Sequence, residues 1–480
     1  MVHINKGMSR RSFLQQTAGV AAGAAALNSA LKSWAAEAGV DDPLKDDRPI
    51  KLALIGSGNQ ALINLVPAAL RIPGVKFTAV SDVVPARAEA AKRLVDPKGE
   101  VGTKVYTDYE QLLKESDADA VMIVTPLSTH HDIVLAAFKA GKHVFCEKCM
   151  AFSVEQCKSM LKAQMAANKI LQIGHHLRYH PLYFFAKDHY VKKGLLGRVN
   201  NIHCSWNRNG SWRNPGIKAP EGQPFDFTKW GFERPDHLFN WRLYKKHSYG
   251  LMTELLSHQF DVINWFMDDK PVQAVQGVGR TDWKEMDRPA EERRTIFDNV
   301  HLIYEYPGEV QVTAESITTN SFCPYGVQAY EIFQGEKGTL VMAHLSRYVG
   351  LFFLEPGVGE ELWMAQAHRI DVAGPQFENV GPERHRRPIV LNGTPSPGSQ
   401  TEKVGNILPL EGLVNIEEAK VIKHTYEIEL LGFKKCVLDK LNPFCDGVVG
   451  MKSAIPALVG YEAMEKQQRV VVDPKIYSLA

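Results

Sequence analysis

Between residues 50 and about 174, the chain alternates short apolar segments with stretches of helical periodicity. Parallel strands need a long connection, usually a helix, so this alternation predicts a doubly wound parallel sheet. The expected strands are residues 51–55, 76–81, 120–124, 143–146 and 170–173. The expected helices are residues 85–94, 109–115, 131–140 and 154–167. We therefore expect an α/β domain over residues 50–174.

The first expected strand runs directly into the sequence Gly56-x-Gly58-x-x-Ala61. In a dinucleotide-binding turn, the first Gly permits the tight turn and the second lets a pyrophosphate approach the backbone. The third small residue lets the helix pack close to the strand. The N–H groups at the start of that helix suit phosphate oxygens. We expect Asn59 and Gln60, in the same turn, to contact the cofactor.

Asp82 stands at the end of the next expected strand, 24 residues after Gly58. A carboxylate there accepts hydrogen bonds from the ribose hydroxyls of the adenosine and repels a 2′-phosphate. The alternative is that Asp82 serves only the turn after the strand. The first interpretation predicts NAD as the cofactor and makes NADP the less favoured one.

Beyond about residue 174, longer alternating segments are separated by turns. The expected strands are residues 199–206, 272–279, 299–306, 310–317, 330–334 and 338–343, and the expected helices are 251–266, 417–440 and 454–467. They predict a second, α+β domain over residues 175–440 with a mostly antiparallel sheet, then a C-terminal helix and tail over 441–480. Residues 355–415 are rich in Pro, Gly and Asn, which predicts a long loop or insertion.

The N-terminal segment has a charged, an apolar and a small-residue region in that order. Arg10-Arg11, followed by an apolar run over residues 17–30, resembles a twin-arginine export signal. We expect residues 1–35 to be the signal peptide, 36–49 to be a linker, and the mature protein to lie in the periplasm or another extracytoplasmic space. The alternative is an ordinary cytosolic extension. No Cys follows the apolar run, so we expect no lipid anchor.

The net charge of +2 gives no reason to expect nucleic acid or an anionic membrane as a partner. Beyond the leader, no apolar run approaches the roughly 18 residues that span a bilayer. The seven Cys are not spaced as a disulfide framework. Cys146-x-x-Cys149 is compatible with a redox or zinc site, but no second pair completes a metal site. We therefore interpret these Cys as small residues at a strand end and expect no metal.

Two motifs follow the turn: Thr125-Pro126-x-x-x-His130, and Ala-Gly-Lys-His-Val-Phe-Cys-Glu147-Lys148. They closely resemble those of the glucose–fructose oxidoreductase, inositol dehydrogenase and rhizopine-catabolism (Gfo/Idh/MocA) family, whose final Pro is here Cys149. The resemblance covers residues 50–345 and returns in the C-terminal helices, whereas 207–246 and 355–415 have no counterpart and are interpreted as insertions. It implies a Rossmann domain, and an open-faced sheet through which homo-oligomers form.

The resemblance also implies that Lys148 lies beside the nicotinamide. A Lys there can donate a hydrogen bond to a sugar hydroxyl or carbonyl oxygen and stabilise developing negative charge. The further residues expected at the cofactor are Arg87, Thr125, Pro126, His130 and Glu147.

A further matching segment contains Glu254, His258 and Asp261, which stand on one stripe of a helix. Dehydrogenases of the family carry Asp-x-x-x-His here, and the His serves as general base or acid, a role that suits imidazole near neutral pH. We expect His258 and Glu254 to be catalytic. The Glu254 side chain is one methylene longer than the family's Asp. Whether Glu254 orients His258 or binds a substrate hydroxyl therefore stays open.

The substrate is expected to meet residues from two places. His176, Arg178 and Tyr179 lie at the domain junction, where His176 replaces the family's Asn. A metal at His175 and His176 is discounted, because adjacent residues on an extended chain point apart. Trp206 and Trp241 bound an aromatic-rich segment with interleaved charges, which suits a pyranose ring; loop packing explains the same composition.

These features predict an exported oxidoreductase that transfers a hydride between tightly bound NAD and a carbon of a sugar, glycoside or polyol. The alternative is a redox-neutral, NAD-dependent glycosidase that oxidises a carbon, eliminates the aglycone, adds water and returns the hydride. A binding protein without catalysis is disfavoured by the combination of Lys148, Glu254 and His258.

Overall fold

The computed structural model describes residues 46–214, 226–281, 288–322, 328–344, 349–355, 389–391 and 418–479. The predicted signal peptide, most of the predicted linker and most of the loop predicted over residues 355–415 lie outside the described residues.

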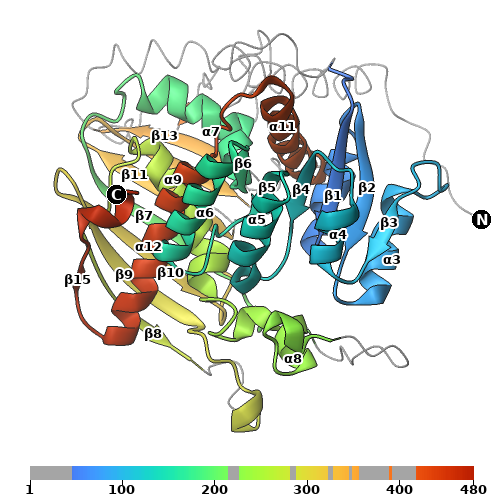
Figure 1. Cartoon of the computed structure of the whole chain (residues 1–480). Helices are drawn as coiled ribbons and strands as arrows, with labels where there is room; N and C mark the ends of the chain where they lie inside the picture. Colours follow the sequence, from blue (N-terminus) through green and yellow to red (C-terminus); the bar gives the residue numbers. More distant parts are fainter. Residues whose placement is uncertain are drawn as a thin grey trace, which may run out of the picture.

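The first sheet has six parallel strands in the order β3-β2-β1-β4-β5-β6 (Figure 1). The strands are β1 (Ile50–Ile55), β2 (Val75–Ser81), β3 (Lys104–Tyr106), β4 (Ala120–Ile123), β5 (His143–Glu147) and β6 (Leu171–Gly174). The predicted doubly wound sheet is confirmed, and the strand order reverses between β1 and β4, where such sheets bind ligands. The edge strand β3 was not predicted, because three residues are too few to show a pattern.

Helices connect these strands: α2 (Val66–Ala69), α3 (Pro85–Val95), α4 (Tyr109–Glu115), α5 (His130–Lys139) and α6 (Val154–Ala167). The first connection begins with a π-helical turn over Gln60–Leu65 before α2 starts. Gly141, with a φ of 72°, ends α5 as the sequence predicts.

The second sheet has nine strands in the order β14-β13-β12-β11-β7-β10-β9-β8-β15. The strands are β7 (Val199–Trp206), β8 (Ala274–Arg280), β9 (Asn299–Tyr306), β10 (Val310–Ile317), β11 (Ala329–Gly335), β12 (Gly338–His344), β13 (Val349–Leu354), β14 (Ile389–Val390) and β15 (Val470–Val471). Neighbouring strands are antiparallel except β7 and β10, which are parallel. The mostly antiparallel sheet is therefore confirmed.

One face of this sheet packs on helices, chiefly α9 (Ser257–Phe266) and α12 (Gly447–Lys466). Tyr304 of β9 shows the packing, because its ring lies 5.0 Å from that of Phe260 and its hydroxyl donates to the Pro456 carbonyl at 2.9 Å. On β9, alternate residues such as Ile303 point to the other face and are exposed. The opposite face is therefore open along β8, β9 and β10.

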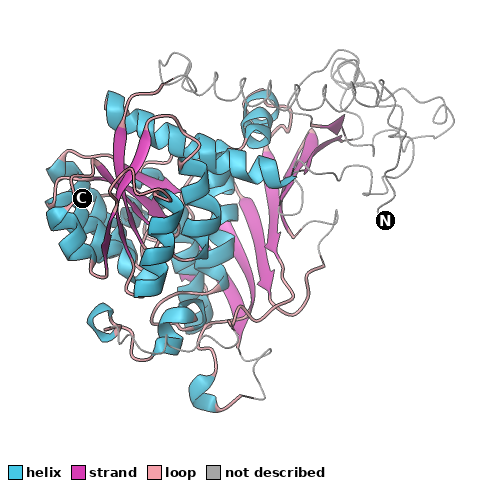
Figure 2. Cartoon of the chain, turned by 90° about the vertical axis from the view of Figure 1, so that its right-hand side faces the viewer, coloured by secondary structure: helices cyan, strands magenta, loops and turns pink. Residues whose placement is uncertain are grey.

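The C-terminal region joins the two sheets instead of forming a separate tail. The backbone N–H of Ile173 in β6 donates to the Cys445 carbonyl, just before α12, and β15 pairs with β8 at the edge of the second sheet. The helix α11 (Glu418–Asp439) packs on α2 and on the turn at His176–Tyr179. Figure 2 shows helices between the two groups of strands.

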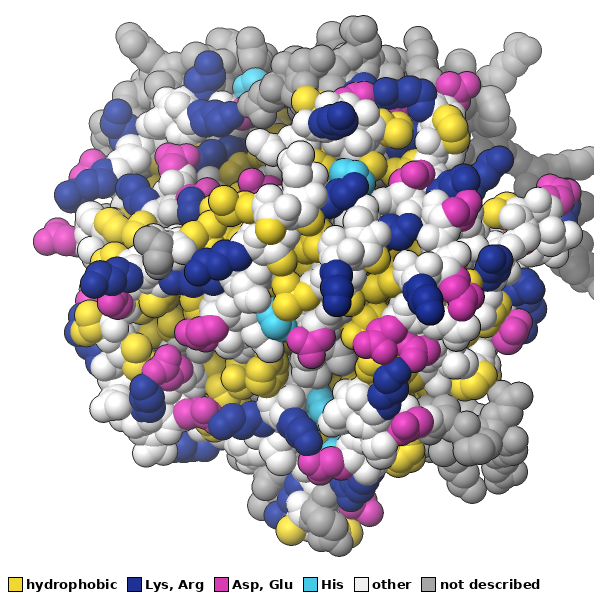
Figure 3. Space-filling view, viewed as in Figure 1, with side chains coloured by type: hydrophobic (Ala, Val, Ile, Leu, Met, Phe, Trp, Pro, Cys, Tyr) yellow, Lys and Arg dark blue, Asp and Glu magenta, His cyan; other side chains and the backbone are white. Residues whose placement is uncertain are grey.

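Among the described residues, no helix combines the length and the apolar character that crossing a membrane requires. On the face drawn in Figure 3, basic and acidic side chains are interspersed.

Candidate active site

A cavity of about 1180 Å³ lies at the carboxyl ends of β1, β2, β4 and β5, and the second domain closes it from the other side. Ligand pockets usually measure about 300–1,000 Å³, so this cavity can hold a dinucleotide together with a small substrate. The parallel sheet therefore presents its ligand-binding edge to the second domain.

The turn after β1 fits a pyrophosphate. Gly56 has a φ of 93°, and a Cβ there would lie 2.5 Å from the Val124 carbonyl oxygen, so a side chain is excluded. A Cβ on Gly58 would meet nothing within 4 Å, so the backbone at Gly58 is open to the cavity. Ala61 is fully buried against the strand. Asn59 and Gln60 line the cavity beside this turn.

Asp82 lies at the cavity rim with 8% of its surface exposed. It accepts hydrogen bonds from the Ser57 N–H at 2.7 Å and from the Val84 N–H at 2.9 Å. Burial raises the pKa of Asp82 above its ordinary value, and the two hydrogen bonds and Arg87 act against this. Arg87 also lines the cavity, with its guanidinium 4.9 Å from the centre of the Phe239 ring.

The loop after β4 brings Thr125 and Pro126 to the cavity, but His130 does not line it. His130 is 1% exposed, and its ring nitrogens lie 3.0 Å from the carbonyl oxygens of Thr125 and Cys149. The expected cofactor contact of His130 is therefore corrected: the side chain ties the loops after β4 and β5 together, because it starts α5 and points into the interior.

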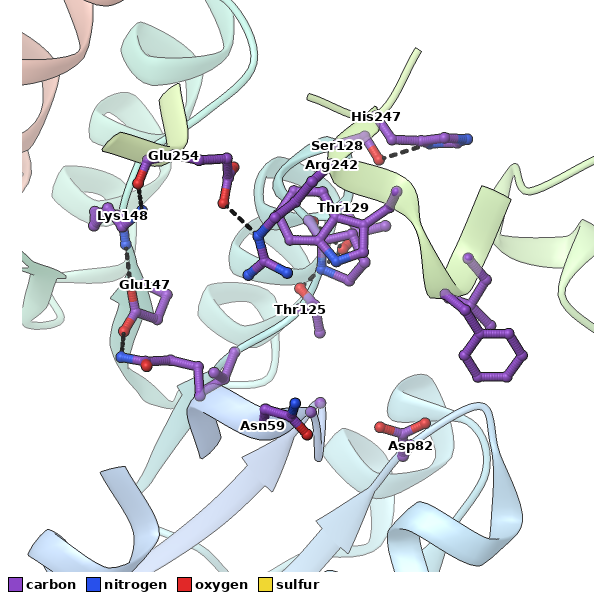
Figure 4. Close-up of a pocket in the computed structure, with 18 of the residues that line it drawn as sticks. Asn59, Asp82, Thr125, Ser128, Thr129, Glu147, Lys148, Arg242, His247 and Glu254 are labelled. Carbon is purple, nitrogen blue, oxygen red and sulfur yellow. Dashed lines mark hydrogen bonds and ion pairs between the residues drawn. The ribbon is translucent and has the colours of Figure 1, made fainter. Parts of the chain in front are cut away.

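Lys148 is held between the two domains by a chain of polar contacts (Figure 4). Glu147 accepts from the Lys148 N–H at 2.9 Å and from the Gln60 side chain at 2.8 Å. The Lys148 ammonium donates to the Glu254 carbonyl at 2.8 Å. Glu147, Lys148 and Glu254 all line the cavity, so the ammonium lies where the parallel sheet meets the second domain.

The peptide bond between Lys148 and Cys149 is cis. Cys146 and Cys149 are both buried free thiols, and burial raises the pKa of Cys149 to about 12. Among the described residues, no group of three or more His, Cys, Asp or Glu side chains is arranged to hold a metal ion.

Glu254 turns its carboxylate to Arg242, whose Nε donates to it at 2.9 Å, and to Ser248, whose hydroxyl donates at 3.3 Å. Figure 4 shows Arg242 reaching Glu254 from across the cavity. The segment Met252–Leu256 is π-helical and joins α9 at Ser257, so the simple helical stripe expected from the sequence is altered. Glu254 has no contact with His258 among the described hydrogen bonds, so the geometry does not support an orienting role for it.

His258 lies at the same end of the cavity and is 6% exposed. Its ring centre lies 4.9 Å from that of His176 and 5.3 Å from that of Trp206. Its Nδ1 has no hydrogen-bond partner among the described residues. Burial, and next the charge of Lys148, lower the pKa of His258 well below its ordinary value. The imidazole is therefore neutral near pH 7 and able to accept a proton.

The junction residues are divided by a 3₁₀ turn over His176–Tyr179, where the sequence reasoning assumed an extended chain. His176 lines the cavity, but Arg178 and Tyr179 do not, and the substrate contacts expected of both are corrected. Arg178 is buried and donates to Asp261 of α9 at 2.7 Å. The Tyr179 hydroxyl accepts from the Cys445 N–H at 3.3 Å. Arg178 thus attaches the turn to α9, and Tyr179 attaches it to the segment just before α12.

The aromatic-rich segment bounded by Trp206 and Trp241 contributes residues to both ends of the cavity. Trp206 and Trp241 both line it; Trp206 lies beside His258, whereas Trp241 packs on the apolar cluster around Val84. Residues 226–247, here called the clasp, reach back over the first domain and include α8 (Pro235–Phe239). Lys229 of the clasp lies 2.5 Å from Asp108. The clasp also packs its apolar side chains around Val84, beside Asp82. The aromatic-rich segment therefore both packs on the first domain and lines the cavity.

Two further residues that line the cavity, from α11 and β12, were not predicted from the sequence. Tyr426 of α11 accepts from the Gln60 side chain at 3.3 Å, and its ring lies 4.8 Å from that of His176. His344, at the end of β12, lines the cavity close to Trp206. No local motif marks either residue, because only the tertiary packing brings them to the cavity.

Comparison with known proteins agrees with this geometry. Residues 50–175 match the oxidoreductase family with an NAD-binding Rossmann fold, and residues 188–341 match the GFO/IDH/MocA C-terminal domain. Inositol 2-dehydrogenase of Azotobacter vinelandii is 28% identical over 226 residues, which are 47% of this chain and 56% of that enzyme. The scyllo-inositol 2-dehydrogenase (NAD⁺) of Bacillus subtilis is 25% identical over 62% of this chain and 75% of that enzyme.

Among solved structures, a levoglucosan dehydrogenase in complex with NADH and levoglucosan superposes with a TM-score of 0.62 and 18% identity, over 88% of this chain and 99% of the other. This likeness shows the fold. The two family matches together span more than half of the chain, and the turn at Gly56 and Gly58, with Asp82 after β2, fits the dinucleotide that the first match implies. The chain belongs to the GFO/IDH/MocA family of NAD-binding oxidoreductases.

Proposed function

We propose that the protein oxidises a hydroxyl-bearing carbon of a sugar, glycoside or polyol, and that NAD accepts the hydride. The observation that carries this proposal is the convergence of Lys148 and a neutral His258 at one end of a cavity that also contains the dinucleotide turn. The names of the inositol dehydrogenases among the relatives support a polyol or sugar as the substrate class.

Each residue at this end of the cavity has a separate role in the proposed reaction. NAD, when bound, supplies the carbon that accepts the hydride. Lys148 donates a hydrogen bond to the substrate oxygen and stabilises the negative charge that grows there. The neutral imidazole of His258 takes the hydroxyl proton, and its low pKa keeps it free of protons before the reaction. Trp206 beside His258 limits access of water to this end.

The test is the reduction of NAD by the purified protein with myo-inositol, glucose, levoglucosan and a nitrophenyl glucoside. We expect His258→Asn and Lys148→Met each to lower kcat/KM by about 10² to 10⁴, while His301→Asn, on the open sheet face, changes it little. Wild-type turnover by His258→Asn would contradict the assigned base. Release of nitrophenol without net reduction of NAD would instead favour the redox-neutral glycosidase.

We also propose that the protein is exported with NAD tightly held, and that the clasp is what retains it. The support is the twin-arginine-like leader together with the contacts of Lys229 and of the apolar clasp residues with the first domain. Mass spectrometry of protein purified from the periplasm without added cofactor should find NAD or NADH in about equal amount to protein. Protein that stays in the cytoplasm, unaffected by R10K/R11K, would contradict export.

The open face of the nine-stranded sheet is the surface that we propose for homo-oligomers. Val278 and Ile303, 57% and 44% exposed, lie on this face. We expect light scattering to show more than one subunit, and Ile303→Asp to lower the oligomer's mass. A wild-type monomer would contradict this assignment.

A further inference from the structure

One arginine that lines the cavity is half-buried and has no ion pair among the described residues. Arg208 is the second residue after the end of β7, and its Nε is buried without a hydrogen-bond partner among the described residues. Its guanidinium lies 5.4 Å from the centre of the Trp206 ring and 5.7 Å from that of Trp212. Taking a cation out of water without an anion is costly, so such a residue calls for a ligand with negative charge.

Two other arginines that line the cavity each have a carboxylate partner. Arg213 has the carboxylate of Asp236 at 3.3 Å, and Arg242 has that of Glu254 at 2.9 Å. Glu254 cannot easily serve Arg208 as well, because its oxygens already accept from Arg242 and Ser248. Burial, and next the charge of Arg242, lower the pKa of Arg208, and the charge of Glu254 opposes them only in part.

The place of Arg208 identifies the ligand that would meet it. The adjacent Trp206 ring lies 5.3 Å from that of His258, so Arg208 belongs to the end where Lys148 and His258 lie. The pyrophosphate is expected at Gly58, in the turn after β1, and Asp82 and the clasp mark the adenosine end. The missing anion therefore belongs to the substrate and not to the dinucleotide.

We propose that the substrate carries a carboxylate, which Arg208 binds, and that it is a hexuronic acid or a glycoside of one. A planar guanidinium donates two parallel hydrogen bonds to a planar carboxylate. The indoles of Trp206 and Trp212, which both lie near this guanidinium, suit the apolar face of a sugar ring. A phosphate dianion fits less well, because the carboxylate of Glu254 lies close by and Arg208 supplies a single compensating charge.

This inference rests on the proposed function, and the test separates the two. Protein loaded with NAD is titrated with glucose and glucuronate, galactose and galacturonate, and glucose 6-phosphate, with tryptophan fluorescence reporting binding. Reduction of NAD is measured in parallel. We expect at least one uronate to bind about ten- to a hundredfold more tightly than its neutral sugar, as loss of a charged hydrogen-bonded pair implies.

Arg208→Gln should remove that preference while its affinity for the neutral sugar stays within about threefold, and Arg208→Lys should retain part of the preference. Arg198→Gln, at the opposite end of β7 and exposed, removes the same charge and should leave the preference intact. No preference for either uronate, a preference that survives Arg208→Gln, or a preference for the phosphate would overturn the inference. Failure of every sugar to reduce NAD, with the preference still present, would contradict the proposed function alone.

Discussion

At the scale of the residue, the sequence predicted side chains whose place follows from a local motif. Gly56 and Gly58 are where the turn after β1 needs them, and Lys148 faces the cavity from the end of β5. The prediction from the sequence failed where the direction of a side chain depends on a turn. Arg178 is only two residues from His176, yet the 3₁₀ turn sends it to Asp261 of α9 and leaves His176 in the cavity.

The carboxylate of Glu254 binds Arg242 and makes no described hydrogen bond to His258. The effect of replacing Glu254 can therefore be predicted separately from that of replacing His258. We expect Glu254→Gln to raise KM about tenfold and to change kcat by less than about threefold, since Arg242, which lines the cavity, loses the carboxylate that holds it in place. The pH at which kcat/KM declines on the acid side should stay unchanged, because His258 keeps its surroundings.

Kinetics at several pH values measure all three quantities. Glu462→Gln on α12, whose partner is the exposed Lys466, is the matched control. A shift of the acid decline in Glu254→Gln alone would show that Glu254 does tune His258 after all.

At the scale of the element, the clasp connects the second domain with the adenosine end of the cavity. Trp230 of the clasp contacts Tyr109 at the start of α4, with ring centres 4.8 Å apart. Ser128, in the loop after β4, contacts His247 at the other end of the clasp at 3.2 Å. If the clasp retains the dinucleotide, as we propose, the dinucleotide leaves the cavity only when such contacts break.

We therefore predict that Trp230→Ala speeds the release of NADH about two- to tenfold, the range expected for loss of one aromatic pair. Trp230 is only partly buried, so the melting temperature should change little. Release can be measured by trapping NADH that dissociates with excess lactate dehydrogenase. Thr228→Ala, in the same turn, is the control, and equal release rates in wild type and Trp230→Ala would exclude the clasp as the retaining element.

At the scale of the whole molecule, the two domains share a buried interior rich in histidine. Burial lowers the pKa of His175 to about 4 and that of His344 to about 3. Unfolded histidine binds a proton below about pH 6.5, whereas these folded ones do not until much lower pH. The unfolded state therefore binds more protons between about pH 4 and 6.5, and acid favours unfolding.

We predict that the free energy of unfolding falls as the pH is lowered from 6.5 towards 4, by up to about 1.4 kcal/mol per pH unit for each such histidine. Urea unfolding at a series of pH values measures this. A flat profile between pH 6.5 and 5 would contradict the burial of these rings.

Glu331 acts in the opposite direction, because burial raises its pKa to about 8 and the folded state then binds the extra proton. Its stabilisation is complete below about pH 4.5 and is lost as the pH rises towards 8. Glu331→Gln should therefore gain stability relative to wild type as the pH rises from 5 to 8. The Tyr183 hydroxyl, which donates to Glu331 at 3.1 Å, keeps a partner in the amide.

The sequence by itself determined the alternation of strands and helices over residues 50–174, the dinucleotide turn and the family, because each depends on residues close together in the chain. The tertiary structure decided what lies around the reacting atoms. It paired Glu254 with Arg242, left the Nε of Arg208 without a hydrogen-bond partner among the described residues, and brought Tyr426 from α11 to His176. Such pairings depend on helix register, on turn direction and on contacts between residues hundreds of positions apart, and no local pattern encodes them.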